Sequence, residues 1–196
     1  MPTKRHALRR FFVAAALCAI SSILLTSPSH AQTSKWPDKP VRIVVPFAPG
    51  GSNDVVARRL ADSLRQSLGQ PFLIENKPGA GSVVGANYVA QAAKDGYTIL
   101  FVSGSLATTA GVQKTPYDAK LAFEPITTVA ESPFVLLLRE NLGVKNLNEL
   151  IAYVKANPGK VNYGTAGIGD NAQLMTELLA KEVGGLKMQS IAYTGI

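Results

Sequence analysis

Residues 41–60, which read VRIVVPFAPGGSNDVVARRL, are the stretch that decides the fold. The run from residue 41 to residue 45 is short, β-branched and mostly apolar, as is typical of a strand buried on both faces. Two prolines follow, and they end the strand because proline has no N–H for the ladder. A helical pattern then begins near Ser52 and ends at Gly69. The stretch therefore predicts a strand, a turn and a helix.

Gly50 and Gly51 occupy the turn between this strand and this helix. Glycine allows positive φ and lets a ligand come close to the main chain. Backbone N–H groups at the start of a helix bind anions without any charged side chain. A tight connection with no ligand explains the same stretch equally well, so both interpretations stay open at this point.

Glycine-rich turns between a strand and a helix recur at 79–82 and 164–171. Strands are expected at 71–74 and 97–102, and in the later part of the chain at 126–129, 134–138, 161–163 and 188–192. Asn146 and Glu149 form a capping box that opens a further helix. Repeated strand–turn–helix steps predict an α/β fold with a mostly parallel sheet, in which ligands bind at the carboxyl ends of the strands.

The N-terminal segment, residues 1–31, has the layout of a secretory signal peptide. A basic start precedes an apolar run, and small residues precede a cleavage point after Ala31. An uncleaved anchor is the alternative, and Arg9-Arg10 only weakly suggests a twin-arginine signal. We therefore expect a periplasmic product.

Composition excludes several function classes. Four of the 20 basic residues and none of the 13 acidic residues precede residue 32, so the rest of the chain carries 16 basic and 13 acidic residues, a balance of +3. That excess is too small to indicate a nucleic-acid partner. The two histidines, His6 and His30, and the single cysteine, Cys18, all lie in the signal segment. We expect no catalytic residues, no metal and no cofactor; an exported enzyme that uses Asp54 is the weaker alternative.

Several motifs together resemble the Bug family, the extracytoplasmic solute receptors of tripartite tricarboxylate transporters. They are WPDKPV at 36–41, PFAPGG at 46–51 followed by Asp54, Ala57 and Arg58, GQP at 69–71, ENKPGAGS at 75–82, DGYT at 95–98, PYD at 116–118, PGK at 158–160, and AG at 166–167 followed by Gly169. The resemblance runs from residue 36 to the end of the chain.

This resemblance implies a type II periplasmic-binding-protein fold with two α/β lobes, which we place at 32–122 and 123–196. It implies that a small carboxylate (a di- or tricarboxylate, an amino acid or an aromatic acid) is held by backbone amides and passed to membrane transporter subunits. The implied ligand-binding residues, together with Ser103 at the end of a strand, are Phe47, Pro49, Gly50, Gly51, Ser52, Asp54, Gly79, Ala80, Gly81, Ser82, Thr165, Gly167, Gly169 and Asp170.

Two departures from the family pattern bear on function. Family members often carry Ser and His where this chain has Asp170 and Gln173. A carboxylate at Asp170 could repel an acidic ligand or attract an amine on it, so the ligand's identity is not predicted. The chain also stops where the family's second lobe continues and returns to the first. We therefore expect an incomplete second lobe, and a truncated, non-functional fragment is the alternative to a working receptor.

Overall fold

The structure is a computed structural model that describes residues 35–193. The chain divides into two units, residues 1–36 and 37–196, and the description below concerns the second. The expected signal peptide therefore lies outside the described residues.

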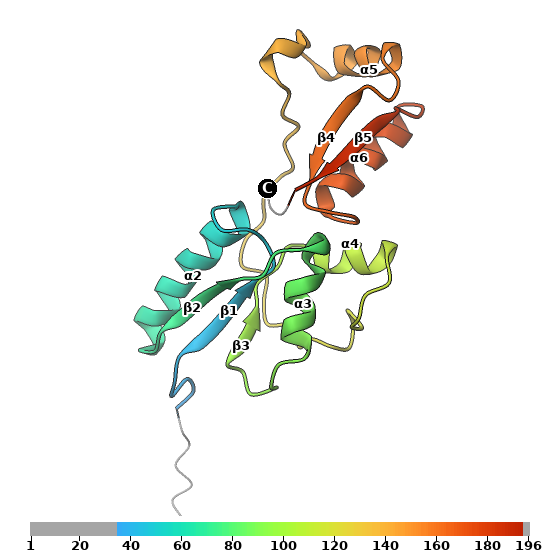
Figure 1. The fold of residues 1–196 in the computed structure, drawn as a ribbon. Coiled ribbons are helices and arrows are strands. Elements are labelled where there is room, and N and C mark those ends of the chain that lie inside the picture. Colours follow the sequence, from blue (N-terminus) through green and yellow to red (C-terminus); the bar gives the residue numbers. More distant parts are fainter. Residues whose placement is uncertain (1–34, 194–196) are drawn as a thin grey trace, which may run out of the picture. The chain divides into compact units, whose positions relative to one another are not determined.

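A three-stranded parallel sheet is built from the first half of this unit (Figure 1). Its strands are β1 (Val41–Val45), β2 (Phe72–Asn76) and β3 (Thr98–Leu100). They lie in the order β2-β1-β3, and Val41 is paired with Phe72 at the start of the register between β1 and β2. The central position of β1 explains its apolar sequence, because four of its five residues are buried. The predicted parallel α/β arrangement is confirmed.

Each strand of this sheet is followed by a helix: α2 (Ser52–Leu68), α3 (Val83–Ala90) and α4 (Ser105–Val112). A short 3-10 turn, η1 (Ala80–Ser82), precedes α3. Helix α2 packs on β1 and β2, whereas α3 packs on β3 and β1. Gly69 ends α2 in the left-handed conformation, as predicted. Because the strands are parallel, all three helices begin from the carboxyl edge of the sheet.

The second part of the unit contains η2 (Glu140–Leu142), α5 (Leu147–Ala156), β4 (Val161–Thr165), α6 (Asn171–Glu182) and β5 (Met188–Ala192). Strands β4 and β5 pair in parallel. At the predicted capping box the Asn146 Oδ1 accepts the Glu149 N–H at 3.0 Å, and the Glu149 carboxylate accepts the N–H of Lys145, one residue before the N-cap, at 2.9 Å. Leu150, Val154, Ala180 and Leu186 form a small separate core.

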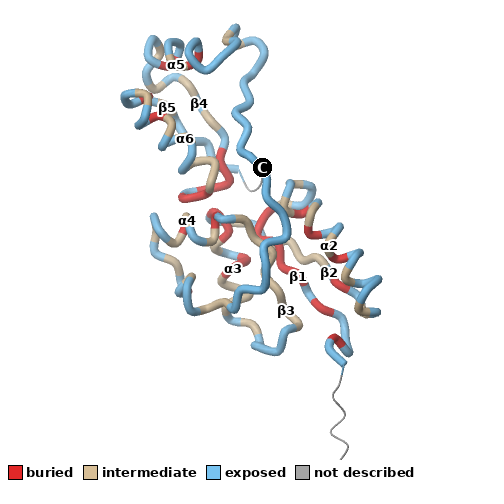
Figure 2. The backbone as a smooth tube through the Cα atoms, turned by 180° about the vertical axis from the view of Figure 1, so that it is seen from behind, coloured by how far each residue is buried: buried red, intermediate tan, exposed pale blue. Residues whose placement is uncertain are grey.

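The strands predicted at 126–129 and 134–138 are wrong. Residues 123–139 have no regular secondary structure, and every residue from 124 to 141 is exposed, as the continuous pale tube before α5 shows (Figure 2). A strand needs a neighbour for its hydrogen bonds, and among the described residues none pairs with this segment. Its apolar sequence favours a strand, but that preference alone does not form one.

No helix between residues 35 and 193 has the length and apolar character that crossing a membrane requires.

Ile43 provides a direct test of the first core, because its side chain is only 1% exposed at the centre of β1. Removing one methylene by Ile43→Val is expected to lower the free energy of unfolding by about 1 kcal/mol. The same substitution at Ile126, which is 75% exposed, is expected to have almost no effect. Urea unfolding of both variants measures the difference, and equal losses would contradict the assigned core.

Candidate ligand site at the carboxyl edge of the first sheet

The first sheet gathers three helix N-termini at one edge. Helices α2, α3 and α4 each begin within a few residues of the end of β1, β2 and β3, and none of the three has a side-chain cap. The first N–H groups of a helix have no acceptor inside the helix. In α2 the first intrahelical bond comes from Val55 to the Gly51 carbonyl, so the N–H groups of Ser52 and Asn53 lack an intrahelical acceptor. In α3 and α4 the first N–H groups donate to the preceding turns, as from Val84 to the Gly79 carbonyl and from Leu106 to the Ser103 carbonyl. The amide donors suited to an anion therefore lie at the start of α2.

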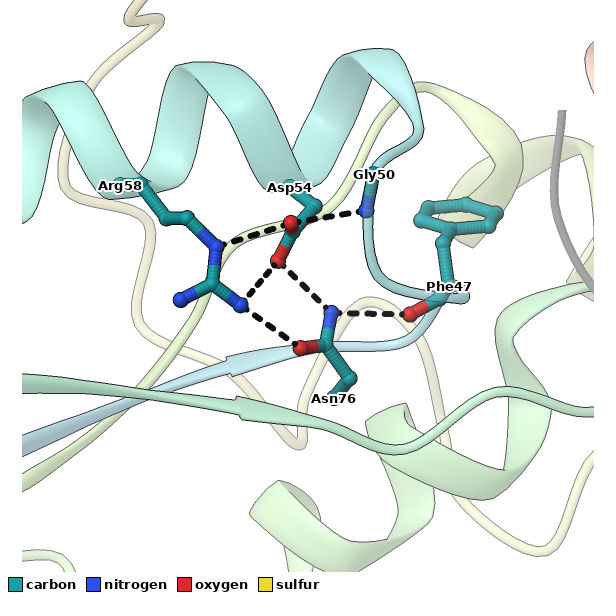
Figure 3. Close-up of polar contacts among 5 residues, drawn as sticks. All are labelled: Phe47, Gly50, Asp54, Arg58 and Asn76. Atoms are coloured by element: carbon teal, nitrogen blue, oxygen red, sulfur yellow. Dashed lines mark hydrogen bonds and ion pairs between the residues drawn. The ribbon is translucent and has the colours of Figure 1, made fainter.

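The turn before α2 is held by the buried carboxylate of Asp54, which is 2% exposed (Figure 3). Its Oδ2 accepts the Gly50 N–H at 2.9 Å, which draws the turn back onto the helix. Arg58 donates to both carboxylate oxygens, at 2.9 and 3.0 Å, in a two-point pair. Asp54 therefore fixes the turn.

Asn76 connects this turn to the end of β2. Its Nδ2 donates to Asp54 at 2.9 Å and to the Phe47 carbonyl at 3.1 Å, while its Oδ1 accepts from Arg58 at 3.3 Å. One amide side chain thus engages both the strand-to-helix turn and the ion pair. The end of β1, the end of β2 and the start of α2 are held as one rigid group.

The hydrogen bonds from Arg58 lower the pKa of Asp54 from its ordinary value of 3.8 to about 2, with further donation from Gly50 and Asn76, although burial acts in the opposite direction. Such a carboxylate is ionised at neutral pH and has its lone pairs occupied. It is a poor general base, which counts against the enzyme alternative.

Because the folded-state pKa of Asp54 lies below the unfolded value, its ionised form stabilises the fold above about pH 4. That stabilisation is expected to be lost as the pH falls from about 4 towards 2. Asp54→Asn removes the charge and is expected to cost roughly 2 kcal/mol at pH 7. It should also flatten the acid limb of stability between pH 4 and 2.

The matched control for this test is Asp62→Asn, at an exposed position on the same helix. Urea midpoints at a series of pH values measure both variants. An unchanged acid limb in the Asp54 variant would show that another group controls acid unfolding.

The second turn, 79–82, has an unusual backbone. Gly79 (φ 138°), Ala80 (φ 48°), Gly81 (φ 63°) and Ser82 (φ 86°) all have positive φ. Positive φ is costly for alanine and serine, and residues held in this way concentrate at functional sites. The surrounding structure must therefore over-determine the turn.

Hydroxyl groups from α4 hold this turn. Thr109, which is fully buried, donates to the Gly81 carbonyl at 3.0 Å. The Ser105 hydroxyl donates to the Ser82 hydroxyl at 3.4 Å and lies 3.0 Å from the Ser103 hydroxyl. The predicted residues Ser82 and Ser103 are thus joined through Ser105, and α4 supports the turn that opens α3.

The third turn, residues 165–170, uses its amides internally. Asp170 is the N-cap of α6: its Oδ1 accepts the Gln173 N–H at 2.8 Å and its Oδ2 accepts the Ala166 N–H at 2.9 Å. The Gly169 N–H donates to the Gln173 side chain at 2.7 Å. Unlike the three helices of the first sheet, α6 has a capped N-terminus, and the Asp170 carboxylate is engaged by its own turn.

The second and third turns meet through their glycines. A Cβ on Gly167 would lie 2.6 Å from the Gly81 nitrogen, and a Cβ on Gly81 would lie 2.8 Å from the Ile168 carbonyl oxygen. Gln113 also donates to that carbonyl at 3.2 Å. Only glycine permits this approach of the two backbones.

The predicted residues therefore divide into three groups. The turn at 47–54 and the turn at 79–82 both lie at the carboxyl edge of the first sheet, with Ser103 at the end of the third strand. The turn at 165–170 contacts the second of these. Arg58, Asn76, Ser105 and Thr109 were missed as site residues. Of these four residues, Arg58 could have been predicted, because it follows Asp54 by four residues, the spacing at which side chains pair on a helix.

Two open depressions lie among the described residues. One, of about 460 Å³, is lined by residues at the amino ends of β1 and β3, including Lys39 and Arg42, and by Tyr88 of α3. The other, of about 250 Å³, is apolar and includes Val112, Ile168 and Leu174. Residues 35–193 contain no group of three or more His, Cys, Asp or Glu side chains placed to hold a metal ion.

Thr109→Val tests the support of the strained turn, because it removes the hydroxyl and keeps the shape. We expect a loss of about 1 kcal/mol in unfolding free energy and faster hydrogen exchange of the amides at 80–84. Thr108→Val is the control; its hydroxyl lies 3.1 Å from the Asn171 Oδ1 rather than against the turn. Exchange that rises equally in both variants would contradict a specific role for Thr109.

A parallel sheet with uncapped helix N-termini at its carboxyl edge is the architecture of an α/β ligand-binding protein. Comparison with known proteins gives the family. Residues 56–196 match the model of the tripartite tricarboxylate transporter family receptor, TctC. The chain belongs to this family, whose members are transport receptors and not enzymes.

A curated relative is a UPF0065 protein of Bordetella pertussis, 40% identical over 190 residues, which are 96% of this chain and 58% of the relative. The chain thus spans little more than half the length of this relative.

Similar solved structures include one described as a periplasmic transporter, 35% identical with a TM-score of 0.77. MatC from Rhodopseudomonas palustris, solved with malate, is 32% identical with a TM-score of 0.75, and an R. palustris protein solved with adipate is 32% identical with a TM-score of 0.78. Each match covers 82% of this chain and 54% or 55% of the other. The predicted α/β periplasmic-binding-protein fold is confirmed over that length.

Proposed function

We propose that this chain is the carboxylate-binding part of an extracytoplasmic receptor that delivers its ligand to a tripartite tricarboxylate transporter. The observation that carries the proposal is the set of three uncapped helix N-termini at the carboxyl edge of the first sheet. Helices α5 and α6, by contrast, begin at Asn146 and Asp170 side-chain caps. At the start of α2, where no side chain caps the helix, the Ser52 and Asn53 N–H groups have no intrahelical acceptor and are left for a ligand.

A carboxylate fits these donors better than a neutral ligand does. Helix N-termini carry partial positive charge, and the nearby Asp54 charge is neutralised by Arg58 within its own hydrogen-bonded group. Amides also hold an anion without an unpaired buried cation, so the empty site carries little electrostatic cost. The malate and adipate found in the two R. palustris relatives are dicarboxylates, which supports the same ligand class here.

Export and the transporter partner follow from the same proposal. The signal-like residues 1–31 direct the chain to the periplasm, and the membrane subunits of the transporter receive the ligand there. Asp170 shapes the binding turn, because its carboxylate caps α6. The negative charge of the ligand is then bound by the backbone amides of the first sheet.

A single amide of the proposed site can be removed by Ser52→Pro. Ser52 is the first helical residue of α2, and Gly51 before it is extended (φ −73°, ψ 169°), so proline is tolerated there. Only the N–H is lost from the backbone. Affinity for a bound dicarboxylate is expected to fall roughly 10- to 100-fold, with little change in the stability of the ligand-free protein.

The experiment begins with thermal melts of the purified chain in malate, adipate, citrate, glutamate and nicotinate, since a ligand at 100 times its Kd stabilises by about 2.7 kcal/mol. Leu147→Pro is the matched control, at the first position of α5 after the extended Asn146. Equal loss of affinity in both variants, or no stabilisation by any carboxylate, would contradict the proposal.

A further inference from the structure

The amino edge of the first sheet lies opposite the three helix N-termini (Figure 1). It holds the depression of about 460 Å³, a volume typical of a small-molecule site. Two sequence motifs that the proposed ligand site does not use, WPDKPV and DGYT, both reach this depression. The first supplies Lys39 and Pro40 to its lining, and the second supplies Asp95, Tyr97 and Thr98.

Arg42 supplies a cation that has no counter-ion. It is the exposed residue of β1, whose other four residues are buried. Its Nη1 donates to the Tyr88 hydroxyl at 2.9 Å and its Nη2 donates to the Thr98 hydroxyl at 3.3 Å. Both partners are neutral, and no carboxylate between residues 35 and 193 lies within ion-pair distance of this guanidinium. Because a guanidinium has five N–H donors, these two bonds orient it and leave other donors for a ligand.

Lys39 supplies a second cation to the same depression. Its Nζ lies 4.2 Å from the centre of the Tyr97 ring and 3.9 Å from the Asp95 carboxylate. That distance is at the limit of an ion pair and both side chains are about half-exposed, so the pairing is weak. The other oxygen of Asp95 accepts the Tyr97 N–H at 3.0 Å, within the turn before β3. The lining therefore carries two cations and one acid that is already engaged.

A structural role accounts for the neighbouring contacts but not for the charge of Arg42. The Tyr97 hydroxyl accepts the Asp38 N–H at 3.1 Å and donates to the Asp38 carboxylate, which fastens the start of the unit to β3. Lys77 is paired with Glu75 at 2.8 Å. These contacts join elements and leave no charge unpaired. A neutral amide side chain could donate to the hydroxyls that Arg42 contacts, so the fold alone does not require a guanidinium there.

We propose that this depression is a second binding site, which takes a small organic oxyanion: a carboxylate or phosphate group attached to a compact apolar body. The planar guanidinium of Arg42 matches two oxygens of either group in a two-point pair, and Lys39 adds a further positive charge. Pro40, Ala92 and Ala93 also line the depression and offer apolar surface to the body of the ligand. The volume exceeds what an inorganic ion fills, which favours an organic ligand.

The test follows the backbone amide NMR signals of the full chain during titration with benzoate and with phenyl phosphate, which share one body and differ in the anionic group. At least one probe is expected to shift the signals of residues 39–43 and 95–98 saturably, and the tighter of the two identifies the anionic group. Benzyl alcohol, a neutral analogue, should leave these signals in place. Shifts that sodium chloride produces equally, or shifts confined to residues 50–54, would overturn the proposal.

Arg42→Lys keeps the charge and removes the fork, so it is expected to weaken binding roughly tenfold. Because Arg42 is exposed, the melting temperature should not change, and the loss is then one of recognition and not of folding. Arg59→Lys, at an exposed position on α2, is the matched control and should leave the affinity intact. Ser52→Pro, at the opposite edge of the sheet, should also leave it intact, which separates this site from the proposed carboxylate site. Equal affinity of the Arg42→Lys variant and the unaltered chain would overturn the assignment.

Discussion

The hydrogen-bonded group around Asp54 is the constraint on which the ligand edge depends. A buried carboxylate is tolerated only when it is paired, and here Arg58 supplies the charge while Asn76 and the Gly50 N–H complete the hydrogen bonding. Because the carboxylate is directed to Gly50 and not to the first N–H groups of the helix, it fixes the turn and leaves α2 uncapped. A serine or aspartate cap at that position would stabilise the helix and occupy the same donors that an anion needs.

Side-chain capping of helix N-termini also differs between the helices of the first sheet and helices α5 and α6. In α5 and α6 the Asn146 and Asp170 side chains satisfy N-terminal amides. In α2, α3 and α4 that stabilisation is absent, and in the turn before α3 two residues other than glycine have positive φ. The first sheet thus accepts local instability at one edge, which is offset by the Asp54 group and by the α4 hydroxyls of Ser105 and Thr109.

Much of this arrangement could be predicted from the sequence because its determinants are local. The strand at 41–45, the glycine turn, the Gly69 stop and the Asn146 capping box are each encoded within a few residues, and all are present. Asn76 and Thr109 could not be found in this way. Each acts on a turn 29 or 28 residues away in sequence, and only the fold brings them there. At the start of α2 the N-cap position is taken by Gly51, and the Asp54 side chain fixes the turn.

At 126–129 and 134–138 the local sequence strongly favours strands, yet no strand forms. Whether such a sequence forms a strand depends on a neighbouring strand as well. β-propensity reflects packing against neighbours more than an intrinsic preference of the backbone, so Phe134 to Leu138 remain extended but unpaired when no strand adjoins them among the described residues. Ile43 and Val154 lie in two small cores that include no residue of this segment. The two cores can therefore form while the stretch between them stays exposed.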